Sequence, residues 1–221
     1  MATVIFDFDS TLINCESLER IISDKHPNPA ILAQIKEIGS QGMSGTIPFL
    51  TSLEKRLSLV SVSQRDVQTF GSRAKDFLTP GFQELIHTLK ANRVDVWIVS
   101  GAPCEAMLPL VHELDIPRDH ILGVELTWKP DGEFGGIDAS KPINRSKWES
   151  AQQVYKRWSA PIIAIGDGMT DYELYRHKLV DYFIVFTQHA RRQAVLDLSV
   201  PEARSTAELS QILRSLIGIG C

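Results

Sequence analysis

The feature that most constrains this chain is an apolar run near its start that carries two carboxylates, Val4-Ile5-Phe6-Asp7-Phe8-Asp9-Ser10-Thr11-Leu12. Read as a strand, the run places Asp7 and Asp9 on one face, because side chains alternate along a strand. Two like charges on one face repel, so they need a cation between them or one must stay protonated. A calcium loop is excluded, because Leu12 and Leu18 stand where that loop needs Gly and Glu.

The rest of the chain changes its periodicity once. Helical patterns fill residues 14–77 without a strong strand, whereas apolar strands alternate with amphipathic helices from residue 78 onward. Such alternation predicts a parallel sheet covered on both faces. We therefore expect an α/β fold, a doubly wound parallel sheet of the Rossmann-like type, with a core of residues 1–13 and 78–221 and a helical cap of residues 14–77.

Several elements of the core are expected at definite positions. The predicted strands cover residues 94–99, 161–165 and 182–186, and a hairpin is predicted from residues 121–128 and 134–137. A helix is predicted from Ser146, as N-cap, to Trp158. Residues 188–204 show no clear pattern.

Composition narrows the class of protein and its partners. The 221 residues are 43% hydrophobic and 23% charged, which is ordinary for a soluble globular enzyme. A net charge of -4 gives no reason to expect a nucleic acid or an anionic membrane as partner. No apolar run approaches the ~18 residues of a membrane span, and no export leader is visible. Three cysteines, Cys15, Cys104 and Cys221, cannot all pair, which favours a reducing cytoplasm; oligomeric state is left open.

Polar residues follow three of the predicted strands. Asp7 and Asp9 follow the first, Ser100-Gly101 follows the second, and Asp167 with Asp171 follows the strand at 161–165. Each group alone is compatible with an ordinary turn. In doubly wound sheets, however, ligands bind at the carboxyl ends of the strands, where the chain order switches. The coincidence of the three groups predicts an active site at that edge.

These residues suit phosphoryl transfer. Asp7 and Asp167, with the neighbouring main-chain carbonyl of Asp9, are hard oxygen ligands suited to Mg²⁺ and a substrate phosphate. Asp7 is then placed to act as nucleophile and form an aspartyl-phosphate. Asp9, beside a like charge, is expected to stay protonated, to protonate the leaving group and then to deprotonate the attacking water.

The phosphoryl oxygens need donors and a cation. The Ser100 hydroxyl and the N–H groups around Gly101 are the expected donors. Lys147 and Lys141 are the candidates for the cation. We favour Lys147, because it starts the helix that leads into the strand of Asp167, whereas Lys141 lies in a loop without such a constraint.

Four segments of the chain resemble, in order, the motifs of the haloacid dehalogenase superfamily of phosphotransferases: Asp7-Phe-Asp9-Ser-Thr11, Ser100-Gly101, Lys147 and Gly166-Asp167-Gly-Met-Thr170-Asp171. The resemblance covers most of the chain and is closest to the phosphoserine phosphatase family, which carries a helical cap between the first two motifs. It implies a catalytic role for Asp171 and a substrate-binding role for Thr170.

The resemblance also implies roles for four residues of the predicted cap. Glu16 matches the residue that contacts the substrate ammonium, and Arg56 matches the residue that holds its carboxylate. Met43 and Phe49 match the apolar residues that close over the substrate. Independently of the family, phosphoserine carries an ammonium and a carboxylate, and Glu16 with Arg56 supplies one opposite charge for each.

The sequence departs from the family pattern at two places. Ala102-Pro103 replaces a second glycine and an aromatic residue after the second motif, and the segment from His120 to Asn144 is longer than expected. Both departures concern substrate choice more than chemistry. We predict a Mg²⁺-dependent phosphomonoesterase that converts L-phosphoserine to L-serine, as in serine biosynthesis.

Two alternatives remain. The same mechanism would serve another small phosphomonoester, such as an amino-alcohol, sugar or histidinol phosphate, or phosphoryl transfer to an acceptor alcohol. A non-enzymatic phospho-acceptor domain also uses a phosphorylated Asp on a parallel sheet. Asp9 as an acid–base group and a substrate-sized cap argue against that second alternative.

Overall fold

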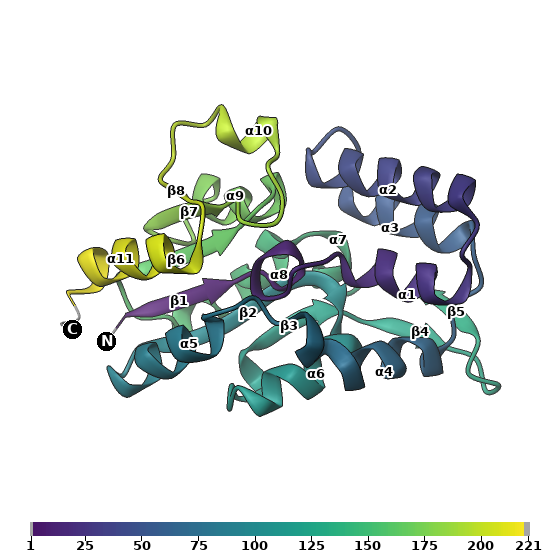
Figure 1. The fold of residues 1–221 in the computed structure, drawn as a ribbon, viewed down its shortest axis with the longest axis horizontal. Coiled ribbons are helices and arrows are strands. Elements are labelled where there is room, and N and C mark those ends of the chain that lie inside the picture. The colour runs from purple at the N-terminus through teal and green to yellow at the C-terminus, as the bar shows by residue number, and fades with distance from the viewer. Residues whose placement is uncertain (1, 219–221) are drawn as a thin grey trace.

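A computed structural model of the protein describes residues 2–218 and shows a central six-stranded sheet with the strand order β3-β2-β1-β6-β7-β8 (Figure 1). Every neighbouring pair of strands in this sheet is parallel. The strands are β1 Thr3–Phe6, β2 Asp95–Pro103, β3 Ile121–Val124, β6 Ile162–Gly166, β7 Tyr182–Phe186 and β8 Glu202–Ala203. Because the chain moves outward from β1 in both directions, the predicted doubly wound sheet is confirmed.

Helices cover both faces of this sheet. Val4 and Phe6 of β1 pack into the apolar cluster under one helical layer, whereas Ile5 packs into the cluster under the other. The first layer contains α5 Phe82–Ala91, α6 Cys104–Glu113 and α11 Thr206–Ile217. The second contains α7 Pro142–Arg145, α8 Lys147–Val154, α9 Met169–Arg176 and α10 Gln193–Leu196. Burial on both faces explains why the core strands are apolar without alternation.

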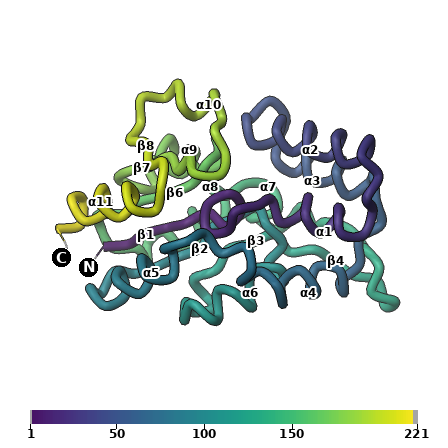
Figure 2. The backbone as a smooth tube through the Cα atoms, viewed as in Figure 1, coloured from purple at the N-terminus to yellow at the C-terminus, as the bar shows by residue number. Residues whose placement is uncertain are grey.

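Four helices follow β1 and lie together beyond its carboxyl end (Figure 1). They are α1 Ser17–Lys25, α2 Pro29–Met43, α3 Phe49–Ser58 and α4 Gln64–Arg73. Figure 2 shows the chain leaving β1, winding through these helices and returning to α5. The two connecting segments lie side by side, because Asn14 N–H donates to the Phe77 carbonyl at 2.9 Å and Thr79 N–H donates to the Leu12 carbonyl at 2.9 Å.

The first strand is shorter than the sequence suggests. β1 ends at Phe6, and residues Phe8–Leu12 form a turn, η1, in which Asp9 and Ser10 have non-helical backbone angles and the φ of Ser10 is 51°. The Asp7 carboxylate accepts the Phe8 N–H at 2.7 Å, and the Ile13 N–H reaches back to the Phe8 carbonyl at 2.9 Å. These bonds close a turn where the prediction had a continuing strand. The expectation of a strand through Leu12 is therefore wrong beyond Phe6.

The second strand is longer than predicted. β2 continues through Ser100-Gly101 to Pro103, with a break in its pairing to β3 between Val99 and Pro103. Ser100 and Gly101 therefore lie within an irregular strand rather than after it. Further along, α8 stops at Val154, and the remaining predicted helix is a 3-10 turn, η4 Tyr155–Arg157. Two other 3-10 turns are η2 Ala74–Phe77 and η3 Arg118–His120.

The predicted hairpin is divided between two sheets. Residues 121–124 form β3 of the main sheet, and only β4 Leu126–Trp128 pairs with β5 Phe134–Ile137. Glu125 separates β3 from β4, because its N–H and its carbonyl each bond the Asn144 side chain at 3.0 Å. The main chain at this residue is thus paired with a side chain instead of a strand.

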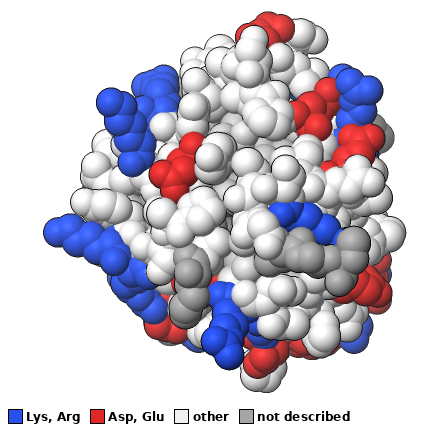
Figure 3. All heavy atoms as spheres, turned by 90° about the vertical axis from the view of Figure 1, so that its left-hand side faces the viewer, with Lys and Arg blue, Asp and Glu red and all other residues white. Residues whose placement is uncertain are grey.

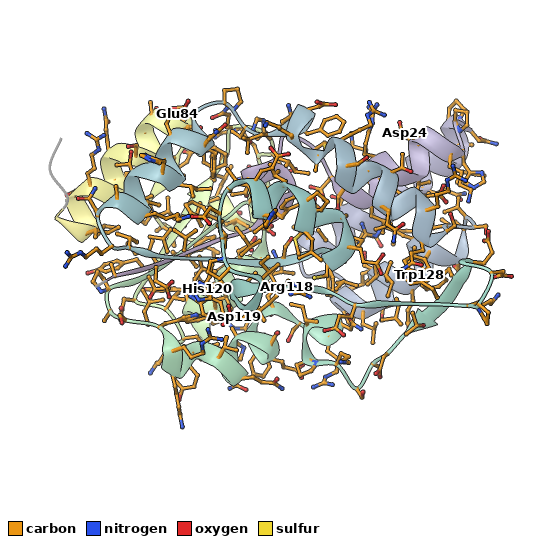
Figure 4. The ribbon with its side chains drawn as sticks, turned by 90° about the horizontal axis from the view of Figure 1, so that it is seen from below. Asp24, Glu84, Arg118, Asp119, His120 and Trp128 are labelled. Atoms are coloured by element: carbon orange, nitrogen blue, oxygen red, sulfur yellow. The ribbon has the colours of Figure 1, made fainter. Side chains whose placement is uncertain are left out.

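The hairpin also explains the length of the 120–144 segment. It contacts the residues that lead into α4, through bonds from Phe134 N–H to the Val62 carbonyl at 3.1 Å and from Gln64 N–H to the Gly132 carbonyl at 2.9 Å. Figure 4 shows Trp128 of this hairpin at the same end of the molecule as Asp24 of α1. The extra residues therefore brace the inserted helices.

The remaining observations concern membrane spans, cysteines and surface charge. In residues 2–218, no helix is long and apolar enough to cross a membrane. Cys15 and Cys104 are free thiols, and Cys221 lies outside the described residues, as do residue 1 and residues 219–220 of the predicted core. The face opposite the inserted helices carries scattered groups of both charge signs (Figure 3).

Candidate active site

The centre of the site is a buried lysine between two buried carboxylates. Lys147 Nζ lies 2.9 Å from Asp7 Oδ1 and 2.6 Å from Asp171 Oδ1. Lys147 begins α8, and Ser146 caps that helix by accepting the Glu149 N–H at 3.2 Å. The helix start therefore directs the lysine at the end of β1, as its sequence position suggests.

The second lysine candidate lies elsewhere. Lys141 Nζ pairs with Glu125 Oε2 at 3.1 Å, and both side chains are about half exposed. The structure therefore brings Lys147, and not Lys141, to the carboxylates of the first and fourth motifs.

The charged groups at this centre shift one another's pKa. Burial acting alone would lower the pKa of Lys147, but Asp171 and Asp7 outweigh it and raise that pKa. Burial and the charge of Asp7 raise the pKa of Asp171 to about 7, against the opposing effect of Lys147. Lys147 therefore remains a cation, and two carboxylates share its charge.

Asp9 is turned toward the first inserted helix. Its two oxygens accept the Ser17 N–H at 3.0 Å and the Ser17 hydroxyl at 2.9 Å. Burial, followed by the charges of Glu16 and Asp7, raises the pKa of Asp9 well above its ordinary value, although the Ser17 bonds oppose this. The predicted direction of the shift agrees, but burial is a larger cause than the neighbouring carboxylate.

Three carboxylates are close enough to share a metal ion. Asp7, Asp167 and Asp171 each offer an oxygen, and these oxygens lie within 4.8 Å of one another. Asp167 is fully buried, and in the described part of the chain its Oδ1 has no hydrogen-bond partner. A buried carboxylate oxygen without a donor is costly unless a cation meets it, so these residues fit Mg²⁺. The predicted metal ligands were Asp7, Asp167 and the main chain at Asp9, and Asp171 was not among them.

The second motif faces an aromatic ring of α3. The Ser100 hydroxyl is buried and accepts the Ala102 N–H at 3.1 Å. Phe49 lies directly over Gly101, so a methyl group added there would be 2.7 Å from Phe49 Cε2. Only a glycine lets the ring approach this closely. Met43 lies in the same way against Gly168, whose added methyl would be 2.8 Å from Met43 Cε.

A small cavity joins these groups. Its volume is about 20 Å³, enough for roughly one water molecule. It is lined by Asp7, Asp9, Glu16, Leu18, Met43, Phe49, Arg56, Ser100, Gly101 and Lys147. Thr170 is not among them; it lies buried in the first turn of α9, and its Oγ1 has no hydrogen-bond partner in residues 2–218.

Arg56 is a buried cation in the wall of this cavity. Its Nε donates weakly to the Ser52 carbonyl at 3.4 Å, and among the described residues the carboxylates act on it by charge alone, without an ion-pair contact. Burial lowers the pKa of Arg56, while Glu16 and Glu19 act in the opposite direction. A buried guanidinium without a paired carboxylate is suited to an anionic ligand.

Arg192 is a residue of the site that was not predicted from the sequence. Its Nε lies 2.7 Å from Asp167 Oδ2, and its Nη2 lies 2.9 Å from Glu16 Oε1. It lies just before α10, in the segment without a clear pattern. No spacing or periodicity distinguishes Arg192 from its neighbour Arg191 in such a segment, so only the pair of positive charges could have drawn notice.

Comparison with known proteins agrees with this geometry. A family model described as haloacid dehalogenase-like hydrolase matches residues 4–176. The chain belongs to this family. It is therefore an enzyme, a phosphoric monoester hydrolase similar to the phosphoserine phosphatases, and the non-enzymatic phospho-acceptor alternative is set aside.

Three similar proteins illustrate the relationship. The chain is 33% identical to the chloroplastic phosphoserine phosphatase of Arabidopsis thaliana over 87% of this chain and 65% of that protein. It is 30% identical to the phosphoserine phosphatase of Bos taurus over 88% of this chain and 85% of that protein. The crystal structure of a phosphoserine phosphohydrolase-like protein from Francisella tularensis aligns with a TM-score of 0.92 and 39% identity, covering 96% and 100% of the two chains.

Proposed function

We propose that this enzyme is a Mg²⁺-dependent phosphoserine phosphatase that acts through an aspartyl-phosphate on Asp7. The observation that carries the proposal is the cavity, which joins the Asp7–Asp9–Lys147 group to the buried Arg56. One wall therefore holds groups for phosphoryl transfer, and another holds a cation for a second anionic group. The relatives named above support phosphoserine as the substrate.

The first step forms a bond between an Asp7 oxygen and phosphorus. Asp7 Oδ1 accepts the Phe8 N–H and lies 2.9 Å from Lys147 Nζ, which orients the carboxylate and leaves Oδ2 to attack. The bond between phosphorus and the substrate oxygen breaks, and protonated Asp9 gives its proton to the leaving oxygen. Lys147 and the Ser100 hydroxyl stabilise the charge on the phosphoryl oxygens.

The second step releases phosphate. The Asp9 carboxylate takes a proton from water, the water oxygen bonds to phosphorus, and the bond to Asp7 breaks. Asp7 and Asp167, with Asp171 or the main-chain carbonyl of Asp9 nearby, would hold Mg²⁺, whose charge would let the Asp7 nucleophile approach a dianionic phosphate.

Residues 14–77 are proposed as a cap and the remaining residues as the core. The paired connecting segments at 12–14 and 77–79 suit a unit that moves as a body. Because the cavity has room for roughly one water molecule, we expect the cap to open for the substrate to enter. Met43 and Phe49, packed on two glycines, then close over the bound ester. Thr170 stays a predicted substrate-binding residue.

The substrate is tested with Arg56→Ala, using Lys55→Ala as the control because Lys55 is the exposed neighbour on α3. A charge-assisted contact contributes about 1.5–3 kcal/mol, or roughly ten- to a hundredfold in kcat/KM. Arg56→Ala should lose this factor with phosphoserine and much less with an aryl phosphate that lacks the amino-acid group. Lys55→Ala should match the wild type with both substrates.

An equal loss with both substrates would show that Arg56 serves the structure and not recognition. The substrate assignment would be wrong if the wild type did not hydrolyse phosphoserine. Hydrolysis of an amino-alcohol, sugar or histidinol phosphate, or phosphoryl transfer to an alcohol, would then identify the activity. Ala102-Pro103 would then be the first place to look for the altered specificity. The nearby Pro103 lacks a main-chain N–H donor beside the phosphate site.

A further inference from the structure

Arg192 joins two carboxylates that serve different ligands in the proposed function. Its guanidinium is a planar fork that donates through Nε to Asp167 Oδ2 and through Nη2 to Glu16 Oε1. Asp167 belongs to the metal-binding group, and Glu16 lines the substrate cavity. One side chain therefore bridges the two subsites.

Each of these carboxylates is held by one oxygen only. Asp167 Oδ1 is buried and has no hydrogen-bond partner in the described part of the chain. Glu16 Oε1 accepts from Arg192 and from the Ser10 hydroxyl at 2.8 Å, and no described residue donates to Oε2. The fork thus leaves one oxygen of Asp167 for a cation and one oxygen of Glu16 for a substrate ammonium.

The contact also links distant parts of the fold. Glu16 is the N-cap residue of α1, the first helix of the proposed cap, whereas Asp167 follows β6 in the core. Arg192 comes from the segment before α10, 176 residues from Glu16 in the sequence. Its side chain is 18% exposed, so this ion pair is largely shielded from solvent and from salt.

We propose that Arg192 is a positioning residue that orients Asp167 for the metal ion and Glu16 for the substrate ammonium. The substrate half of this inference rests on the proposed function. Outer residues that orient ligating carboxylates typically change metal affinity by 10- to 100-fold. A lysine at this position has one ammonium group and cannot reproduce the planar fork.

The direction of the change separates orientation from charge. If Arg192 acted only as a positive charge near the metal ion, its removal would tighten Mg²⁺ binding, because repulsion would fall. If it orients Asp167, its removal weakens binding. Arg191 is the matched control, because it carries the same charge one residue away but pairs outward with Glu202 at 2.7 Å.

The experiment is a calorimetric titration of metal-free protein with Mg²⁺. Arg192→Ala should raise the Kd by roughly 10- to 100-fold, Arg192→Lys should recover only part of this loss, and Arg191→Ala should match the wild type. In steady-state assays, Arg192→Ala should also lower the ratio of kcat/KM for phosphoserine to kcat/KM for an aryl phosphate.

The inference would be overturned if Arg192→Ala bound Mg²⁺ as tightly as Arg191→Ala or more tightly. This holds even if the thermal stability of Arg192→Ala is lower. A wild type without phosphoserine turnover would refute the proposed substrate. A loss of Mg²⁺ affinity in Arg192→Ala would still support the orientation of Asp167 in that case. The two failures are therefore distinguishable.

Discussion

Replacement of Lys147 by methionine tests the buried charge centre. The substitution keeps a long side chain but leaves Asp7 and Asp171 without the cation that lies 2.9 Å and 2.6 Å from them. Removing one partner of a buried ion pair costs about 3–5 kcal/mol, because the remaining charges are buried and unpaired. Each kcal/mol shifts the Tm of a protein of this size by about 2–4 °C, so the Tm should fall by roughly 6–20 °C.

The matched control is Lys141→Met. Lys141 pairs with Glu125 across a half-exposed surface, where such pairs contribute about 0–1 kcal/mol. The stability of both variants is measured by thermal and urea unfolding in the presence of a chelator, so that metal binding does not mask the difference. Only Lys147→Met should also lose catalytic turnover.

The loss of stability in Lys147→Met should depend on pH. Burial and Asp7 raise the pKa of folded Asp171 from 3.8 to about 7, so its folded form holds a proton that the unfolded chain releases. Its contribution to stability therefore falls as the pH rises through this range. Without Lys147, the penalty should be larger at pH 8 than at pH 6. Equal losses for Lys147→Met and Lys141→Met would refute the buried centre.

Two further predictions concern the metal ion and the second motif. Chelation should abolish phosphate release, Mg²⁺ should restore it, and excess Ca²⁺ should inhibit, because calcium accepts longer bonds and more ligands; full activity of metal-free protein would contradict this. Gly101→Ala should lower kcat/KM by roughly tenfold, equal to about 1.4 kcal/mol, because its methyl group displaces the Phe49 ring. Phe49→Leu in the same variant should restore part of the loss, and kinetics unchanged by Gly101→Ala would disprove the close contact.

The sequence predicted the parts of the site that follow from strand order. Asp7, Ser100 and Lys147 come from three separate segments, yet the parallel sheet brings their segments to one edge. That outcome needs only the rule that ligands bind where the strand order switches. Lys147 could be chosen over Lys141 because a helix start has a defined direction and a loop does not.

Local main-chain geometry could not be predicted in the same way. The turn at Phe8–Leu12 is held by short-range bonds that hydrophobic periodicity does not reveal, including the Ser10 N–H to the Cys15 carbonyl, and β2 changes its register with β3 between Val99 and Pro103. The inclusion of Asp171 among the possible ligands depends on the first turn of α9. Arg192 contacts Glu16 only after the whole chain has folded, so no local pattern marks it.

The hairpin shows a related limit. Its apolar alternation correctly predicted strands, but Asn144 decides where β3 ends and β4 begins by binding the main chain of Glu125. A side chain distant in sequence therefore divides a run that looks continuous. The contact of the β4–β5 hairpin with the segment before α4 also depends on this division.

The aspartyl-phosphate is tested most directly in Asp9→Asn. With an aryl phosphate, the leaving group needs no proton, so Asp7 can still be phosphorylated, whereas hydrolysis lacks its base and slows by roughly 10²–10⁴-fold. Rapid acid quenching followed by peptide mass spectrometry should then find one added phosphoryl group, located on Asp7. The Asp7→Asn/Asp9→Asn double variant should carry none. An unmodified Asp7 in Asp9→Asn, with phosphate still released, would contradict the mechanism.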